Sequence, residues 1–371
     1  MVYQILTGDN RETLKAIADN SIDAIVTDPP YGIDFLGKDW DANTGALETY
    51  QECLRVLKPG GHILAFSAAR TYHHLAVTLE QAGFEIRDQI MWIYSSGFPK
   101  SQDIGRSIQR TEKTKDPNAW SGWGTCLKPA HEPIALARKP IKVGSIAQNC
   151  LKHGVGALNI DATRVPFADD DTLEEWKQRY PDVANGTAET HANFNPELQG
   201  KKKKKSDVEI YLNNKKGPME RSTAKDGEGI GMFEGKVGYK TIKREVDPAV
   251  DLPSGRFPSN VVGEIAEPYQ KYFYCPKVGR KERHIEDAVE NNHPTVKPIE
   301  LMKYLIRLVT PEGGTVLDPF NGSGSTGCAA VELGMTYIGC ELDPKYVEIA
   351  RTRIEAWYAH TNPLKATGLF E

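Results

Sequence analysis

Strand-like and helix-like segments alternate at both ends of this 371-residue chain, and this alternation constrains the fold more than any other feature. Short apolar, β-branched runs are separated by amphipathic ones from Val2 to about Tyr94, and the same rhythm returns near Pro298. Such alternation is typical of a parallel sheet with helices on its faces. We therefore predict an α/β fold whose doubly wound, Rossmann-like sheet is assembled from both chain ends.

The expected elements are short and closely spaced. The strands are residues 3–6, 22–26, 62–66, 84–94, 314–318 and 336–341. The helices are residues 10–18, 47–57, 72–83, 298–309, 324–334 and 344–357. The sequence Lys-Pro-Gly-Gly at 58–61 is expected to stop the second helix, because Pro and Gly disfavour helix interiors.

The middle of the chain lacks this rhythm. Between about residues 95 and 290 Gly, Asn and Pro are scattered, and residues 131–139 and 156–165 are the best strand candidates. This pattern is typical of a loop-rich insertion. We expect residues 1–99 and 290–371 to be halves of one domain and residues 100–289 to be inserted between them. The site should lie at the carboxyl ends of strands from both halves.

Composition limits the class of protein. The net charge is −4, so affinity for nucleic acid would have to come from a local patch. The six cysteines show no regular spacing, which argues against a disulfide scaffold or zinc site and favours the cytoplasm. His73 and His74 are adjacent, so they would point about 100° apart on a helix, and we expect no metal. We also expect no membrane partner, because no run approaches roughly 18 apolar residues and the N-terminus does not resemble a signal peptide.

The sequence TDPPYG from Thr27 to Gly32 follows the second expected strand. Proline fixes its own φ and extends the residue before it, so Asp28, Pro29 and Pro30 should form a stiff segment. Neither proline has an N–H, which leaves acceptors without donors beside them. An acceptor edge followed by the Tyr31 ring suits a flat ring that carries an NH2 group, such as a nucleobase. A strand-ending turn is the alternative, because these residues are common in turns.

A second motif follows the fifth expected strand, which Asp318 ends. A Gly-x-Gly-x-x-Gly pattern at Gly322, Gly324 and Gly327 leads into a helix and lets a ligand approach the backbone. Glu341 ends the next strand, where a carboxylate can accept hydrogen bonds from ribose hydroxyls. The pattern predicts a nucleoside-cofactor site, and on its own it would serve NAD equally well.

Four motifs together resemble those of S-adenosylmethionine-dependent DNA amino-methyltransferases. They are DPPY at 28–31, LKPGG at 57–61, HPTVKP at 293–298 and DPFNGSGSTG at 318–327. Their order, with the catalytic motif before the cofactor motif, is similar to that of the circularly permuted β group of this family. The resemblance covers roughly residues 1–95 and 290–357, and it favours a methyltransferase over an oxidoreductase.

The resemblance implies a catalytic role for the first motif. Asp28 and the Pro29 carbonyl would accept hydrogen bonds from the target NH2, Pro30 belongs to the same stiff segment, and Tyr31 would stack on the base. S-adenosylmethionine would donate its methyl group with no covalent enzyme intermediate, so catalysis would rest on positioning and electrostatics. Because the amine is inaccessible inside a duplex, the base would be flipped out.

The resemblance also implies a set of cofactor-binding residues. They are Asp9, Asn10, Thr295, Lys297, Asp318, Phe320, Gly322, Gly324, Glu341 and Asp343. Asp9 would bind the adenine amine of the cofactor and Lys297 its methionine end, while Phe320 would pack against it. Helix caps are the alternative for Asp9 and Asp343, and a place in the core is the alternative for Phe320.

Double-stranded DNA is the expected partner, and the insertion is the expected target-recognition region. A locally basic stretch contains Lys201, Lys202, Lys203, Lys204 and Lys205, which would contact phosphates or form a solvated loop. Trp120 and Trp123 would stack on DNA or, as the more ordinary outcome, be buried. The sequence does not decide whether the protein forms a homodimer or whether it has a partner nuclease.

The methyl acceptor has several alternatives. Adenine N6 is preferred to cytosine N4, because the family leans toward Ser at the first motif position for cytosine and this chain has Asp28. RNA and protein amides are further acceptors, although the large insertion favours duplex DNA. An NAD-dependent oxidoreductase is the distant alternative, and it leaves the DPPY motif unexplained.

Overall fold

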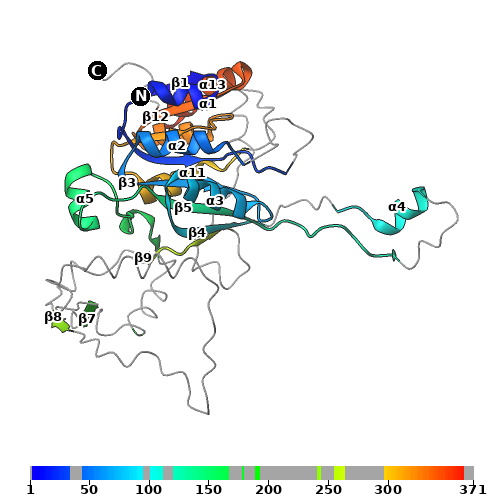
Figure 1. Ribbon diagram of the computed structural model, residues 1–371, viewed down its shortest axis with the longest axis horizontal. Coiled ribbons are helices and arrows are strands. Elements are labelled where there is room, and N and C mark those ends of the chain that lie inside the picture. Colours follow the sequence, from blue (N-terminus) through cyan, green and yellow to red (C-terminus); the bar gives the residue numbers. More distant parts are fainter. Residues whose placement is uncertain are drawn as a thin grey trace, which may run out of the picture. The chain divides into compact units, whose positions relative to one another are not determined.

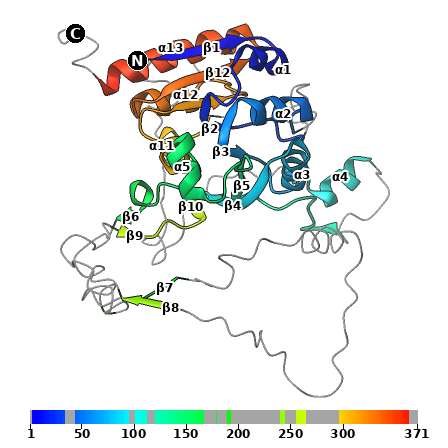
Figure 2. The same ribbon diagram turned by 60° about the vertical axis from the view of Figure 1, so that its left-hand side comes forward.

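The computed structural model describes residues 2–33, 44–94, 101–111, 120–166, 178, 189–192, 240–243, 255–263 and 296–362. The chain divides into two compact units: residues 1–167 together with 254–371, and residues 168–253. The first unit combines the two ends of the sequence, and residues 3–7 and 344–361 lie side by side in both ribbon views (Figures 1 and 2).

The elements are close to those expected at the two ends of the chain. The first part contains β1 (Tyr3–Thr7), α1 (Asn10–Thr13), the 3-10 turn η1 (Leu14–Ala16), β2 (Ile22–Thr27), α2 (Leu47–Val56), β3 (Leu57–Phe66), α3 (Tyr72–Ala82) and β4 (Glu85–Ile93). The middle contains α4 (Ile104–Thr111), β5 (His131–Arg138), α5 (Ile146–His153), the 3-10 turn η5 (Asp161–Thr163), β6 (Val165–Pro166), β7 (Glu189–Ala192), β8 (Lys240–Lys243), β9 (Gly255–Arg256) and β10 (Val261–Gly263). The last part contains α11 (Ile299–Val309), β11 (Thr315–Asp318), α12 (Ser325–Glu332), β12 (Thr336–Glu341) and α13 (Pro344–Thr361).

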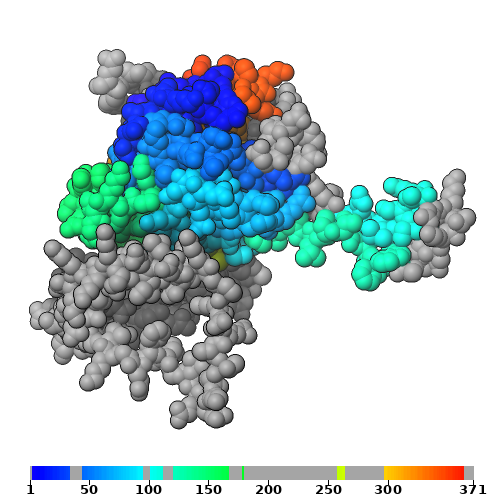
Figure 3. Space-filling view, in the orientation of Figure 1, coloured from blue at the N-terminus to red at the C-terminus, as the bar shows by residue number. Residues whose placement is uncertain are grey.

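An eight-stranded sheet of order β1-β12-β11-β2-β3-β5-β4-β10 forms the centre of the first unit. Strands from the two chain ends interleave, since β1 pairs with β12 and β11 with β2, in both cases parallel. The blue and orange segments therefore lie together in both ribbon views and in the space-filling view (Figures 1, 2 and 3). Only β5 runs antiparallel to its neighbours in this sheet, β3 and β4. The predicted Rossmann-like α/β fold is confirmed.

Helices cover both faces of this sheet. Ala24 and Val26 of β2 belong to one core cluster with residues of α11, α12 and α13. Ile25, between them, belongs to a second cluster with residues of α2 and α3. Successive strand residues point to opposite faces, so both faces of β2 are buried. This burial explains why the β2 sequence is apolar almost throughout.

Three elements differ from expectation. Lys-Pro-Gly-Gly lies inside β3, because α2 ends at Val56 and the strand begins at Leu57. The helix expected at 10–18 is a short α1 followed by η1, and Ile17 is already extended. Residues 156–165 form a turn with only Val165–Pro166 paired in a strand. Thr163 Oγ1 donates to the Asn159 carbonyl over 2.7 Å, and such local bonds compete with a strand ladder.

The insertion also begins and ends elsewhere. β5 and β10, from within the expected insertion at 100–289, are strands of the central sheet. The second unit spans only residues 168–253 and, where it is described, contains the antiparallel pair β7–β8. Because β5 lies between β3 and β4, residues 131–138 belong with the sheet and not with the insertion.

The described residues contain neither a candidate membrane-spanning helix nor a candidate metal site. None of their helices combines the length and the apolar character that crossing a membrane requires. Their His, Cys, Asp and Glu side chains form no cluster of three or more that could hold a metal ion. The His73 and His74 rings contact each other with their centroids 4.0 Å apart.

Candidate active site

One pocket lies at the carboxyl ends of the parallel strands. It is lined by residues that follow β1, β2, β11 and β12, including Asp9, Asp28, Phe320 and Glu341. Because β5 runs in the opposite direction, its first residues reach the same edge, and Glu132 pairs with Trp92 near the end of β4. The pocket therefore receives side chains from both halves of the chain, at the edge where α/β sheets bind ligands.

Asp28, Tyr31, Glu132 and Lys297 form a hydrogen-bonded network in this pocket. The Tyr31 hydroxyl lies 2.8 Å from Asp28 Oδ1 and 2.8 Å from Glu132 Oε2. Lys297 Nζ donates to Asp28 Oδ2 over 2.6 Å and to the Tyr31 hydroxyl over 3.0 Å. It also forms an ion pair with Glu132 Oε2 at 3.4 Å. Two carboxylates thus share one ammonium and one phenol.

Burial and the two carboxylates together determine the charges of Lys297 and Tyr31. Only 6 % of Lys297 is exposed. Its burial lowers its pKa, but the Asp28 and Glu132 carboxylates outweigh that effect and leave the pKa above its usual value. Burial, with these carboxylates as further causes, raises the pKa of Tyr31 well above its ordinary value. Lys297 therefore stays a cation and Tyr31 a neutral phenol, and the network carries a net charge of −1 when both carboxylates are ionised.

Two features of this network escape sequence reasoning. Glu132 was not expected in the site, because it lies in the assumed insertion and reaches the pocket only through the antiparallel direction of β5. Lys297 was expected at the methionine end of a cofactor, but its Nζ contacts Asp28 and lies 4.9 Å from the centre of the Phe66 ring. A charged residue at the start of an apolar strand is the only signal that marked Glu132.

Asp318 holds the end of β11 in place. Its carboxylate accepts hydrogen bonds from Thr27 Oγ1 and Thr326 Oγ1, each over 2.6 Å, and from the Phe320 N–H over 3.0 Å. Burial raises its pKa to about 6, against the effect of these three donors. Asp318 thereby joins β2, the loop after β11 and α12. Its carboxylate is occupied within the protein, so its role here is to shape the loop.

Glu341 closes the opposite side of that loop. Its two carboxylate oxygens accept hydrogen bonds from the Gly322 N–H over 2.8 Å and the Asp343 N–H over 2.9 Å. Burial raises its pKa, and the two backbone donors lower it in part. Phe320 lines the pocket from the same loop and lies 6.4 Å, centre to centre, from the Tyr50 ring. Glu341 at the end of β12 and Phe320 of the loop thus present a carboxylate and an aromatic ring to one pocket.

Two glycines of the loop motif serve helix packing. Gly324 has φ +80°, and a Cβ there would lie 3.0 Å from Ala350 Cβ of α13. At Gly327 a Cβ would lie 2.4 Å from Ile354 Cδ1 and 2.8 Å from the Tyr337 ring. The close approach is therefore to α13 and β12. Gly322, with φ +52°, is the motif glycine whose N–H contacts Glu341.

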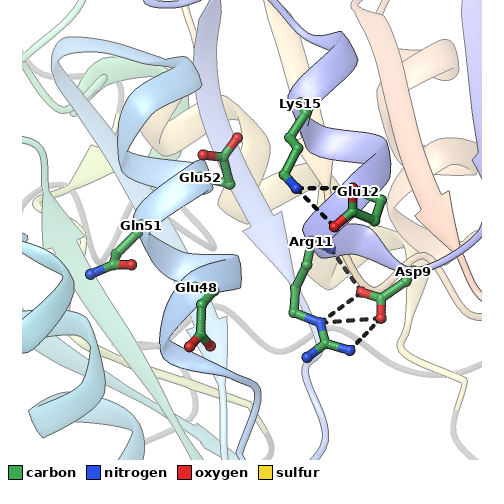
Figure 4. A pocket seen from close by; sticks show the side chains of 7 residues that line it. All are labelled: Asp9, Arg11, Glu12, Lys15, Glu48, Gln51 and Glu52. Carbon is green, nitrogen blue, oxygen red and sulfur yellow. Dashed lines mark hydrogen bonds and ion pairs between the residues drawn. The ribbon is translucent and has the colours of Figure 1, made fainter.

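Of the remaining expected residues, Asp9 and Asp343 cap helices and Asn10 contacts the glycine loop. Asp9 caps α1 through the Arg11 N–H, and Asp343 caps α13 through the Lys345 N–H, each over 2.9 Å. Asn10 donates to the Pro319 carbonyl over 2.9 Å and so ties the first helix to the glycine loop. Asp9 also borders a surface hollow between α1 and α2, where Arg11 contacts Asp9 and Lys15 contacts Glu12 (Figure 4).

Several expected residues lie beyond the pocket or outside the described residues. Thr295 and Lys201–Lys205 fall outside them. Trp120 and Trp123 are not buried: they are 46 % and 60 % exposed, and their rings form an edge-to-face pair with centroids 5.4 Å apart. Pro29 and Pro30 line the pocket beside Asp28.

Comparison with known proteins identifies the family. The model of the N6/N4 DNA methylase family, described as "DNA methylase", matches residues 22–352. This chain belongs to that family of DNA amino-methyltransferases, which use S-adenosylmethionine as the methyl donor. The resemblance seen in the sequence motifs is confirmed, and family membership decides against an NAD-dependent oxidoreductase.

Relatives match over nearly the whole chain. The Type II methyltransferase M.HindIII of Haemophilus influenzae is 26 % identical and covers 95 % of this chain and 96 % of its own length. The Type II methyltransferase M.HpaI of Haemophilus parainfluenzae is 23 % identical, over 96 % of this chain and 75 % of its own length. Among solved structures, the M1.HpyAVI–SAM complex is 18 % identical, covers 95 % of this chain and 99 % of its own, and superposes with a TM-score of 0.42.

The donors and acceptors of the pocket suit this cofactor. Glu341 ends β12 with a carboxylate that can also accept from ribose hydroxyls. Asp9, Phe320 and Glu341 line one pocket from the ends of β1, β11 and β12. The cofactor would contribute an electrophilic methyl group on a sulfonium, and these residues would hold its nucleoside.

Proposed function

We propose that this protein methylates the N6 amine of an adenine flipped out of duplex DNA, at a specific sequence. The observation that carries the proposal is one pocket with two chemically distinct ends. Asp28, Pro29 and Pro30 bring acceptors to one end, and Glu341 with the glycine loop forms the other. A base amine and a nucleoside cofactor fit these two ends.

The first end is built to orient an amine. The lone pair of an exocyclic amine is delocalised into its ring, so the amine is a poor nucleophile until acceptors bind its hydrogens. Asp28 and the Pro29 carbonyl supply such acceptors, and Lys297 fixes the Asp28 carboxylate from its other oxygen. The Tyr31 ring lines the pocket for stacking while its hydroxyl is held by the two carboxylates. Rate enhancement then comes from positioning and preorganised charge.

A single residue, Asp28, favours adenine over cytosine as the target base. The family leans toward Ser at the first position of the motif for N4-cytosine methylation, and this chain has Asp28. Both reactions need an acceptor edge beside an exocyclic amine, so the pocket chemistry alone favours neither. The preference for adenine rests on Asp28.

The segment between β4 and β5 gives the proposal a DNA-contacting surface. Its two ends are joined, since Ser101 Oγ accepts from the Thr125 N–H over 2.9 Å and Ile104 N–H donates to the Trp123 carbonyl over 3.1 Å. It carries the exposed pair Trp120 and Trp123. Residues 126–132, which lead into and begin β5, line the pocket. Exposed aromatic rings stack on unpaired bases or insert between base steps, and we expect the flipped base to leave the duplex beside this segment.

Two measurements test the proposal. DNA methylated by the protein should be digested to nucleosides and resolved by mass, and N6-methyl-2′-deoxyadenosine is the expected product. N4-methyl-2′-deoxycytidine would instead show that the target is cytosine. Single-molecule sequencing of DNA from cells that express the protein should show the modified base in one sequence context. Absence of any methylated base would contradict the proposal.

A further inference from the structure

Glu132 is a partly buried acid that the proposed chemistry does not use. Its side chain is 19 % exposed, comparable with 20 % for Asp28. It contacts the Tyr31 hydroxyl through Oε2 and the Tyr94 hydroxyl through Oε1, at 2.8 and 3.4 Å. Neither contact is needed to orient an amine at Asp28. A carboxylate in this position requires a function or a strong reason for its burial cost.

The position of the Tyr31 hydroxyl suggests that function. A phenol has one hydroxyl hydrogen, yet the oxygen of Tyr31 lies 2.8 Å from a carboxylate oxygen on each side. The hydrogen can therefore be donated to Asp28 or to Glu132, but not to both. Equal distances mean that neither acceptor is closer, so the hydrogen can change sides within the existing geometry.

The reaction requires an outlet for a proton. Methyl transfer to an amine forms an N–CH3 bond and breaks the S–CH3 bond, and the product nitrogen then carries one hydrogen and one positive charge too many. Asp28, which binds the amine, is the nearest base. A base stacked in the pocket would cover Asp28, while Lys297 holds its other oxygen. Release from Asp28 straight into water is then obstructed.

We propose that Glu132 is the final acceptor of this proton, which reaches it from Asp28 through the Tyr31 hydroxyl; the inference rests on the proposed function. Asp28 Oδ1 takes a proton from the methylated amine and passes it to the Tyr31 oxygen. The original hydroxyl hydrogen of Tyr31 moves at the same time to Glu132 Oε2. Asp28 is again a carboxylate, Tyr31 is again a phenol, Glu132 is neutral, and no electrons are exchanged.

The electrostatics of the network favour this transfer. Asp28, Glu132 and Lys297 sum to −1, so uptake of one proton makes the network neutral. The raised pKa of Tyr31 opposes a phenolate intermediate, which agrees with a phenol that takes one proton as it gives another. Lys297 stabilises whichever carboxylate is ionised, because it contacts both.

Glu132→Gln and Tyr31→Phe test the relay in a double-mutant cycle. Under single-turnover conditions, with enzyme in excess over DNA, each change should slow methyl transfer by about 100-fold, the lower end of the range of general acid–base effects. The double variant should be no slower than the slower single variant, because both changes interrupt one path. Cofactor and DNA affinities, measured by calorimetry without turnover, should stay within about twofold. The matched control is Glu85→Gln, which breaks the ion pair that Glu85 of β4 forms with Arg138 of β5; neither residue lines the pocket.

Chemical rescue separates proton transfer from mere support of the site. Glu132→Ala should recover rate when small carboxylates such as formate or acetate are added, and the recovered rate should increase with the basicity of the carboxylate. Recovery that is independent of basicity would overturn the relay, as would a Glu132→Gln enzyme with the wild-type rate or multiplicative effects in the double variant. A wild-type protein that methylates no DNA would instead refute the proposed function, so the two failures are distinguishable.

Discussion

Lys297 Nζ donates to Asp28 Oδ2 over 2.6 Å, although 269 positions of the chain separate the two residues. Asp28 directly follows β2 of the first chain half, and Lys297 lies two residues before the first residue of α11 in the last. The ion pair joins the halves inside the pocket, because parallel pairing of β2 with β11 brings the two segments to one edge. A residue from the second half thus completes the acceptor end of the site.

Replacing Lys297 with Met should cost stability and activity more than cofactor affinity. The change leaves two carboxylates near each other without their cation, and breaking a buried ion pair costs about 3–5 kcal/mol. The loss in unfolding free energy should shrink as the pH is lowered and the carboxylates take up protons. Chemical denaturation at several pH values would measure it. Lys15→Met, which removes a cation 59 % exposed and paired with Glu12, should change little. Selective loss of cofactor binding would instead support the role that the sequence motif implies for Lys297, which is contact with the methionine end of the cofactor.

Asp28→Ala should abolish methyl transfer while cofactor binding survives. The carboxylate is assigned to the target amine, and it lies at the opposite end of the pocket from Glu341. Turnover with labelled cofactor and calorimetric cofactor affinity should be compared in the same preparation. Asp161→Ala, which removes a carboxylate 85 % exposed on η5, is the control. An active Asp28→Ala enzyme would contradict the catalytic assignment.

Gly324→Val and Glu341→Gln should affect the cofactor site in different ways. Valine at position 324 meets a left-handed φ of +80° and the Ala350 side chain at 3.0 Å, so it should lower the free energy of unfolding through α13. Loss of cofactor binding would then be secondary. Glu341→Gln keeps the shape of the side chain, but its NH2 group cannot accept the hydrogen bond that a carboxylate oxygen accepts from the Gly322 or the Asp343 N–H. It should therefore weaken cofactor binding and also lower the free energy of unfolding, by about 1–3 kcal/mol. Thermal unfolding measures the loss of stability and calorimetry measures the cofactor affinity of each variant. A fully stable Gly324→Val protein that binds no cofactor would favour direct contact between Gly324 and the cofactor.

The sequence predicts the sheet and one end of the site, but not the network around Asp28. Alternating strands and helices are local patterns, and a proline pair after β2 marks its carboxyl end. Glu132 reaches the pocket only because β5 is antiparallel, and strand direction is set by long-range pairing with β3 and β4. The neighbour of Gly324 is likewise a residue of α13, a long-range contact that the local glycine pattern does not predict.

His62 should make stability depend on pH. It is 4 % exposed on β3, and burial, with Arg138 and Arg87 nearby, lowers its pKa from 6.5 to about 4. Between pH 6.5 and 4 the unfolded chain binds a proton that the folded protein does not. Stability present above pH 6.5 is therefore lost as the pH falls through this window, by about 3 kcal/mol at one pKa unit per 1.36 kcal/mol.

The difference in unfolding free energy between wild type and His62→Gln isolates this effect. It should fall steadily from pH 6.5 to 4 and be flat above pH 7. A flat difference curve for His62 would show that its imidazole is protonated as readily in the folded protein as in the unfolded chain.

Trp120 and Trp123 should contribute to DNA affinity without affecting the cofactor. Both rings are exposed on the segment that leads to the pocket, and stacking on a base is worth about 1–3 kcal/mol. Each Trp→Ala change should therefore weaken DNA binding by roughly 5- to 100-fold. Stacking releases no counterions, so the slope of affinity against salt should be unchanged, whereas Arg106→Gln should make it shallower if that exposed cation contacts a phosphate. Binding isotherms at several salt concentrations distinguish the two. Wild-type affinity in the double Trp→Ala variant would remove this segment from the DNA interface.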